Sequence, residues 1–417
     1  MSEQSLTPSK GAASVQTPWK KIYVLAIAGA LSWMGSGLTT FAVILRDKDH
    51  VGPGGVASYL LAFSIPTILM APITGLLVDK YSSRQVILTT AAIMGLSSLS
   101  LTFGFPQWWT ICALLITASC GSVMGPAFQA MQVSVTAPDD IPRVTGLLQS
   151  FASAGMLVAP ALGGVLVSTT GYFWPFVIDA ISFWLLGVVF LFLGLNRKPV
   201  VHVDGEKMRA LDGIKFVFSD NLLRSIVILL AVLVLALGSI NVGEVFLVKD
   251  DLGASDFIYG MAGALFATGS IVGSLGTAAL KLPAKRHATA MLAAIAVLIA
   301  TVFGFSMAWH WWVALVLSVV AGMGNAGLMA YSAGIVMTRT PKETLGRVNA
   351  ALGAIIQTGS VTSIALSGTL IALFGVRAVF LIASILGVIV FAIFAPAVFK
   401  YGRLHGASTE AENTPII

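Results

Sequence analysis

Long apolar segments, repeated twelve times, constrain this chain more than any other feature of its sequence. Each segment approaches or exceeds the ~20 residues that an α-helix needs to cross the hydrocarbon core of a bilayer. They run over residues 22–45, 55–78, 86–105, 108–137, 144–168, 174–195, 224–248, 257–280, 288–307, 311–338, 347–374 and 378–399. Only 10% of the residues are charged, against about 25% in a typical soluble domain. The sequence therefore predicts an all-α integral membrane protein with twelve transmembrane helices.

Lysine and arginine are divided unequally between the polar connections. If both termini lie on one side of the membrane, 20 of the 24 basic residues fall on that side, and only Arg46, Lys48, Lys249 and Arg377 fall on the other. Cytoplasmic connections carry the excess of Lys and Arg in membrane proteins. We therefore predict cytoplasmic termini and a multi-pass protein of the cell (inner, cytoplasmic) membrane. The net charge of +6 reports this topology and gives no reason to expect a nucleic-acid partner.

The two halves of the chain share residues at a nearly constant separation. Arg143 recurs as Arg347 and Gly164 recurs as Gly368, each 204 residues later. Duplicated six-helix halves joined by a cytoplasmic linker are common in secondary transporters, with the substrate site between the halves. We expect two pseudo-symmetric six-helix bundles.

These observations divide the chain into five parts. They are an N-terminal cytoplasmic tail (1–21), an N-terminal bundle (22–195), a cytoplasmic linker (196–223), a C-terminal bundle (224–399) and a C-terminal cytoplasmic tail (400–417). Within the linker, charged and apolar residues alternate over 206–218, which predicts an amphipathic helix lying on the membrane surface.

The fifth span contains small residues at short intervals around Pro160, in the sequence RVTGLLQSFASAGMLVAPALGG. Glycine inside a helix costs about 1 kcal/mol relative to alanine in water. In a bilayer, small residues instead let two helices approach closely and gain dispersion energy. Pro160 removes a backbone hydrogen bond and kinks the helix. This span is predicted to be bent and to pack tightly against its neighbours.

The spacing of these residues resembles the fifth-helix signature of drug/proton antiporters in the major facilitator superfamily. The matching positions are Arg143, Gly146, Gly155, Ala159, Pro160, Gly163 and Gly164. Alanine stands at 159, where the family has glycine before the proline. The resemblance covers essentially the whole chain and is closest to the macrolide- and enterobactin-exporting branch. It implies the major facilitator fold and proton-coupled efflux.

The short connection after the second span resembles the family's loop pattern G-x-x-x-D-R/K-x-G-R-R/K. The matching residues are Gly75, Asp79, Lys80 and Arg84. Ser82 and Ser83 replace the usual glycine and basic residue. The resemblance implies a gate in which Asp79 faces the amino end of the eleventh span near Arg347, where the helix dipole and a positive charge favour a carboxylate. Such a contact would form only while the cytoplasmic side is shut and would favour the outward-facing state.

Two carboxylates fall within apolar spans, Asp179 in the sixth and Glu244 in the seventh. Ionisable residues inside a membrane are expensive and mark ion or substrate pathways. Glu244 is the preferred proton carrier, because Asn241 shares its helical face and the seventh span lines the cavity in this superfamily. Asp179, in FVIDAISF, resembles a recurrent acid of the family, so an architectural role stays open there. Each acid lies about 7–8 Å below the outer boundary, so a capping role at the interface is the alternative for both.

By the same resemblance, spans one, four, seven and ten line a central cavity. The candidate substrate-contacting residues are Trp33, Met34, Gln129, Asn241, Asn325 and Tyr331. This set is apolar, polarisable and amide-bearing, without lysine or arginine, which suits varied hydrophobic ligands. The amides are the strongest candidates, since an unpaired amide in hydrocarbon costs several kcal/mol.

Motifs for catalysis are missing from the sequence, which contains no H-E-x-x-H, no G-x-S-x-G and no Walker lysine loop. We predict a transporter without enzymatic activity, cofactor or metal. Its expected partners are a small hydrophobic or amphipathic substrate (a drug, macrolide or siderophore), protons and the lipid bilayer, with a monomer as the expected unit. Proton-coupled import and lipid flipping are the alternative functions.

Overall fold

The computed structural model describes residues 17–137, 140–197, 215, 218–280, 282–340 and 345–412. These residues form helices and short connections, with no strand among them. The first half contains α1 (Trp19–Leu69), α2 (Ala71–Lys80), α3 (Ser83–Ser100), η1 (Leu101–Phe103), α4 (Gln107–Val135), α5 (Ile141–Thr170) and α6 (Phe173–Leu193). The second half contains α8 (Asn221–Leu237), α9 (Ile240–Phe246), the π-helix η3 (Leu247–Asp251), α10 (Asp256–Leu280), α11 (Ala284–Met307), α12 (Trp311–Arg339), α13 (Leu345–Phe374) and α14 (Val376–Glu412).

The described residues include eleven helices that are long and apolar enough to cross a membrane. The first, α1, has 51 residues and contains a break at Gly52, whose φ of 61° is accessible mainly to glycine. An unbroken helix of that length would extend ~77 Å, more than twice the hydrocarbon thickness. Two of the twelve predicted spans, 22–45 and 55–78, therefore fall in α1 and its continuation α2. The twelve-span count is a proposal that takes α1 as two crossings.

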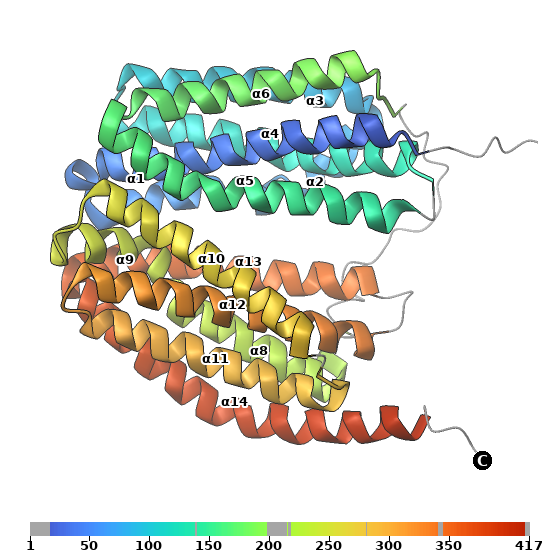
Figure 1. The fold of residues 1–417 in the computed structure, drawn as a ribbon, viewed down its shortest axis with the longest axis vertical. Coiled ribbons are helices and arrows are strands. Elements are labelled where there is room, and N and C mark those ends of the chain that lie inside the picture. Colours follow the sequence, from blue (N-terminus) through green and yellow to red (C-terminus); the bar gives the residue numbers. More distant parts are fainter. Residues whose placement is uncertain are drawn as a thin grey trace, which may run out of the picture.

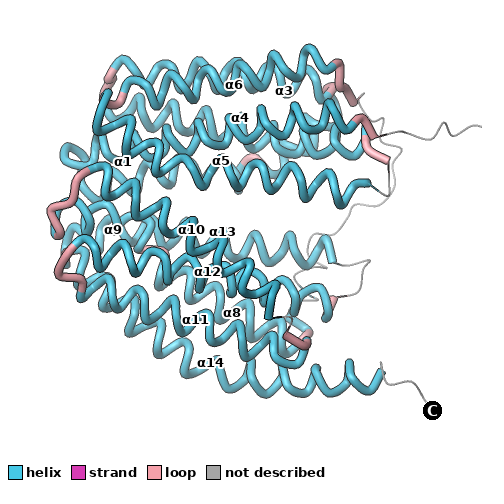
Figure 2. Tube along the Cα trace, viewed as in Figure 1, coloured by secondary structure: helices cyan, strands magenta, loops and turns pink. Residues whose placement is uncertain are grey.

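The helices form two bundles, one from each half of the chain, stacked with α1–α6 above α8–α14 in the view of Figure 1. Short loops connect successive helices at both ends (Figure 2). We call the end containing residues 46–54, 104–106, 171–172, 252–255 and 308–310 the joined end. The opposite end, containing residues 81–82, 136–137, 194–197 and 283, we call the separate end.

Buried apolar residues show why the two ends differ. At the joined end one cluster contains residues of both bundles, such as Phe41 and Val56 from the first half and Val242, Ile371 and Phe380 from the second. Toward the separate end each bundle has its own clusters instead. The ribbons accordingly approach at the left of Figure 1 and spread apart toward the right. The bundles therefore share a core only at the joined end.

Many helix ends lie close to the boundaries expected from hydropathy, but the expected span 55–78 is divided between α1 and α2, and the expected span 224–248 among α8, α9 and η3. α14 continues to Glu412, so the region assigned to the C-terminal tail begins as a continuation of the last helix. The amphipathic helix expected over 206–218 falls largely outside the described residues.

Candidate transport site between the bundles

The glycine-rich helix α5 uses one of its faces to pack against α1 of its own bundle. A Cβ atom added to Gly155 would lie 2.2 Å from the backbone oxygen of Ala30, and one added to Gly163 would lie 2.9 Å from the Phe41 ring. Any larger side chain at Gly155 would push the two backbones apart. This face therefore fixes α5 onto α1.

A second face of α5 crosses to the other bundle. A Cβ atom on Gly164 would lie 3.2 Å from the Cα atom of Gly260 in α10, and one on Gly260 would lie 2.5 Å from the backbone oxygen of Pro160. The fifth-helix signature thus packs on both bundles at once. Ala159 is buried against Gly37 of α1. The other two members lie nearer the separate end, where Gly146 has open space around it and the Arg143 guanidinium lies over the Trp19 ring at 5.3 Å.

The predicted internal repeat reappears as a second contact of the same kind. A Cβ atom on Gly368 of α13 would lie 2.9 Å from the backbone oxygen of Pro53 and 3.0 Å from the Cα atom of Gly54 in α1. Gly164 and Gly368 are the pair that the sequence relates by 204 residues. The two bundles therefore meet through equivalent glycine contacts, α5 on α10 and α13 on α1.

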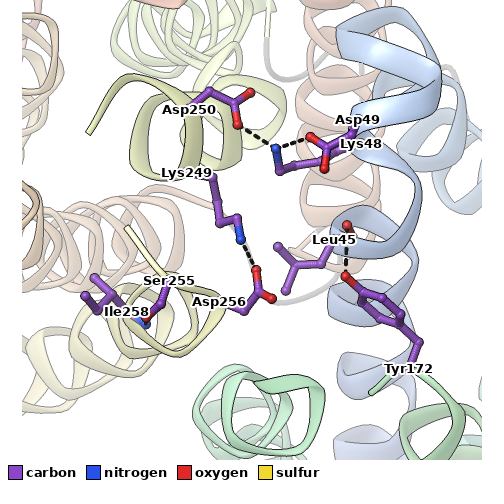
Figure 3. Close-up of polar contacts among 9 residues, drawn as sticks. All are labelled: Leu45, Lys48, Asp49, Tyr172, Lys249, Asp250, Ser255, Asp256 and Ile258. Carbon is purple, nitrogen blue, oxygen red and sulfur yellow. Dashed lines mark hydrogen bonds and ion pairs between the residues drawn. The ribbon is translucent and has the colours of Figure 1, made fainter. Parts of the chain in front are cut away.

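A buried lysine links the bundles at the joined end (Figure 3). The Lys48 ammonium lies 2.5 Å from a carboxylate oxygen of Asp250 and equally close to Asp49, and its side chain is only 4% exposed. Beside it, Lys249 pairs with Asp256 within the second bundle. The sequence carries a signal for this contact that hydropathy does not detect: Lys48 and Asp250 occupy corresponding positions in LRDKDH (45–50) and LVKDDL (247–252).

An aromatic pair crosses the same interface. The rings of Phe41 in α1 and Tyr259 in α10 are stacked, with their centroids 5.1 Å apart and their planes 16° apart. Charge pairing, ring stacking and glycine contacts thus all join the bundles at one end.

Asp179 is enclosed within the N-terminal bundle and is 1% exposed. Its Oδ2 accepts hydrogen bonds from the hydroxyls of Thr39 at 2.7 Å and Ser98 at 2.8 Å, and Ser36 lies 3.5 Å from Oδ1. Gly35 makes room for it, since a Cβ atom there would lie 2.8 Å from Oδ1. These contacts join α6 to α1 and α3. No described lysine, arginine or histidine bonds to Asp179.

Glu244 has the opposite environment. It lies on the short helix α9, partly buried, and its carboxylate forms no hydrogen bond or ion pair with any described residue. The neighbouring Val242 and Val245 belong to the apolar cluster shared by both bundles, and Tyr259 packs against the same cluster. This acid therefore lies beside the surface on which the bundles close.

The predicted gating loop is only partly visible. The backbone places Gly75 and Asp79 in α2 and Arg347 in α13, but the side chains of Asp79 and Arg347 lie outside the described part of the structure. Lys80 is exposed at the end of α2, and the backbone N–H of Arg84 donates to the Asn196 side chain at 3.3 Å. The contact between Asp79 and Arg347 stays a prediction.

Comparison with known proteins identifies the family. Two segments, residues 25–248 and 228–415, match the sequence profile of the Major Facilitator Superfamily and together span nearly the whole chain. The chain belongs to the Major Facilitator Superfamily. It is therefore a multi-pass membrane transporter and not an enzyme, and the resemblance inferred from the α5 signature is confirmed.

Curated relatives of this facilitator include efflux proteins at low identity. The multidrug efflux pump Tap of Mycobacterium tuberculosis is 23% identical over 86% of this chain and 89% of its own length. The class H tetracycline resistance protein of Pasteurella multocida is 25% identical over 41% of this chain. Macrolide efflux protein A of Streptococcus pyogenes is 25% identical over 36% of it. The matches span only 44% and 39% of the last two relatives' own lengths.

A solved structure supports the fold independently. The crystal structure of the nucleoside transporter NupG superimposes with a TM-score of 0.72 at 15% identity, over 90% of this chain and 98% of its own. This likeness concerns the facilitator fold alone.

The candidate cavity residues of this facilitator divide into two groups. Trp33, Gln129 and Asn241 are exposed, and Met34 and Asn325 are partly buried. The Asn241 amide donates to the backbone oxygen of Gly238. Tyr331 differs, because it is 8% exposed and packs in a core cluster of the C-terminal bundle beside His287. Tyr331 was expected to line the cavity, but its ring points into the core of the C-terminal bundle.

Proposed function

We propose that this protein is a proton-coupled antiporter that exports hydrophobic or amphipathic small molecules by alternating access. In this proposal the protein has twelve spans with both termini in the cytoplasm, and its joined end faces outward. It acts as a monomer in the cytoplasmic membrane. The described conformation then corresponds to an inward-facing state.

The observation that carries the proposal is the double contact of α5. Its signature residues hold α1 through Gly155 and Gly163, and reach α10 of the other bundle through Pro160 and Gly164. Small residues allow two helix backbones to approach closely without interlocking side chains. Helix α5 is thus fixed to its own bundle and meets the other bundle through small residues and backbone atoms. Such a contact is suited to an interface along which the two bundles rock.

Two ionic contacts would alternate during this motion. The pair of Lys48 and Asp250 holds the joined end shut, while Asp79 and Arg347 would meet only when the separate end closes. A contact biases a conformational equilibrium only if it forms in one state and not in the other. In this proposal the first pair favours the inward-facing state and the second pair favours the outward-facing state.

Glu244 supports the coupling step of the proposal. Its carboxylate is unpaired among the described residues and lies beside the apolar surface on which the bundles close. A charged carboxylate costs more than a protonated one when that surface is dry, so binding a proton would favour closure of the joined end. One charge moving through 100 mV supplies about 2.3 kcal/mol, enough for roughly a fiftyfold concentration ratio.

The substrate class follows from the exposed candidate residues. An indole and two amides, from Trp33, Gln129 and Asn241, offer apolar area with few hydrogen-bonding groups. The names of Tap and of the macrolide efflux protein agree with substrates of this kind.

A growth-inhibition panel tests the function. Cells with and without the protein are exposed to macrolides, tetracyclines and lipophilic cations, with and without a protonophore. We expect raised inhibitory concentrations for some compounds, and loss of this protection when the proton gradient collapses. Gly260→Leu provides an inactive control, because the added side chain would collide with the backbone of α5 at Pro160.

Transport in oriented vesicles separates export from the alternatives. An exporter accumulates substrate in inside-out vesicles when their lumen is acidic. Accumulation only in right-side-out vesicles would indicate proton-coupled import, and movement of a labelled lipid between leaflets would indicate a flippase.

A further inference from the structure

A crevice opens on the outer surface of the N-terminal bundle, away from the contact between the bundles. It has a volume of about 520 Å³ and lies between α2, α3 and α4. Leu77 and Tyr81 line it from α2 and its end, Val86 and Thr90 from α3, and Cys120 and Val123 from α4. Almost all of its wall is apolar.

The helix faces that line this crevice continue beyond it as surface that faces the membrane. One turn along each helix from the crevice residues lie Ile73 on α2, Ile93 on α3 and Ile116 on α4, which are 46%, 45% and 44% exposed. Residues three or four apart share a helix face. Since exposed isoleucines face lipid in a membrane transporter, the crevice opens toward the acyl chains of the bilayer.

The mouth of the crevice, at the separate end, is polar and positively charged. The Lys80 ammonium lies 5.6 Å from the centre of the Tyr81 ring, and Tyr81 forms part of the wall. The exposed side chains of Gln85 and Thr89 stand beside it on the first turns of α3. A cation, an amide and a hydroxyl thus lie where an apolar channel reaches the membrane surface.

A second crevice provides an internal comparison. It has a volume of about 460 Å³ and lies between α11 and α14, lined by residues such as Ile299, Phe303 and Val388. Its lining residues are all uncharged, with Ser384 the main polar group. Two crevices of similar size and apolar lining therefore differ in that a lining residue of the first, Tyr81, contacts a lysine, and no such cation contact involves a described lining residue of the second.

We propose that the crevice between α2, α3 and α4 binds one anionic phospholipid, with an acyl chain along the apolar wall and the phosphate beside Lys80. Basic groups between transmembrane helices attract acidic headgroups, and an apolar channel without a cation has no such preference. The crevice between α11 and α14 accordingly takes any lipid. The proposal does not depend on the direction or substrate of transport.

Native mass spectrometry of the purified, delipidated full-length protein tests headgroup selection. The protein is offered equimolar phosphatidylglycerol and phosphatidylcholine with identical acyl chains. We expect one bound lipid to show headgroup selection, with phosphatidylglycerol favoured about fivefold. A lipid in the crevice between α11 and α14 should show no such preference. Lys80→Gln should abolish the preference, whereas Lys20→Gln, which removes an exposed cation at the same end, should keep it. Equal binding of both lipids, or a preference that survives in Lys80→Gln, would overturn the proposal.

The two cysteines of the chain locate the lipid without any substitution. Cys120 lies in the crevice wall, and Cys112 is exposed two turns away on the same helix. Phosphatidylglycerol should slow alkylation of Cys120 at least about fivefold more than alkylation of Cys112, and phosphatidylcholine should slow it less. Equal slowing at both cysteines would place the lipid elsewhere and contradict the proposal.

Discussion

The two bundles share a skeleton and differ in the acids that they carry. Gly164 and Gly368 make equivalent contacts across the interface, but 204 residues after Asp179 the chain has Ala383. Ala42 lies 202 residues before Glu244, the separation that relates Lys48 to Asp250. Asp179 is enclosed and receives hydroxyl hydrogen bonds, whereas Glu244 is partly exposed and unpaired among the described residues. The symmetric parts build the interface, and the two acids differ in their surroundings. Asp179 is bonded within one bundle, whereas Glu244 has the unpaired carboxylate that the proposed function assigns to proton exchange.

Replacing Asp179 should produce the largest effect and tests the structural half of this comparison. Asp179→Ala removes the carboxylate that accepts from the Thr39 and Ser98 hydroxyls, leaving Ser98 the Phe176 backbone oxygen at 3.2 Å, and opens a cavity, so we expect a loss of about 2–4 kcal/mol in stability. Asp179→Asn can accept the same two bonds and should cost less than about 1 kcal/mol. Thermal unfolding in detergent measures both. If Asp179→Asn keeps its stability but loses proton-driven transport, the two acids do not divide the work as proposed.

Glu244→Gln tests the other half. Without a titratable group the proton gradient can no longer drive the cycle, so the steady-state substrate ratio should fall from roughly fiftyfold toward one. Counterflow, in which substrate exchanges for substrate, should continue, and thermal stability should be unchanged because Glu244 has no partner to lose among the described residues. Undiminished proton-driven efflux in this variant would assign the proton to another residue.

The charge pair at the joined end tests the symmetric part of the comparison. Asp250→Asn removes one of two carboxylates around Lys48, and we expect the ratio of molecules with that end closed to molecules with it open to fall five- to thirtyfold, equivalent to about 1–2 kcal/mol. The exchange Lys48→Asp with Asp250→Lys should restore closure in part. Distance measurements between spin labels across the joined end report the change. A double variant no better than Asp250→Asn would show that the pair contributes little.

The smallest expected effect compares the two glycine contacts. Gly368→Ala places a Cβ atom within 3.0 Å of backbone atoms in α1, and should cost about 1 kcal/mol of closure. Gly164→Ala meets its neighbours at 3.1–3.3 Å and should cost less. Substrate efflux rates in the two variants measure the difference. Equal effects would mean that the interface relaxes equally at both sites.

Hydropathy predicted the helices well, because a bilayer imposes a sharp limit on where polar residues can begin. The expected spans 257–280 and 311–338 differ by a single residue at one end from α10 (Asp256–Leu280) and α12 (Trp311–Arg339). The expected connection over 46–54 contains the break at Gly52, although the helix resumes after that one residue. The end of α1 at Leu69, inside the expected span 55–78, and the division of the expected span 224–248 into α8, α9 and η3 were not predicted.

Side-chain environments were harder to predict, because hydropathy does not say which face of a helix meets which neighbour. Tyr331 was expected in the cavity and lies in a bundle core. The hydroxyls around Asp179 come from helices that are distant in sequence, so no local pattern indicates them. Lys48 and Asp250 were recognisable only by aligning the two halves and noticing that the charge changes sign.

That change of sign has a consequence for how the halves assemble. Two copies of the first half, related by a true two-fold axis, would set lysine against lysine at this point, and two copies of the second would set aspartate against aspartate. The pairing of Lys48 with Asp250 therefore requires one half of each kind. The repeat that relates the two halves is thus broken in charge at a pair of positions where an exact copy would bring like charges together.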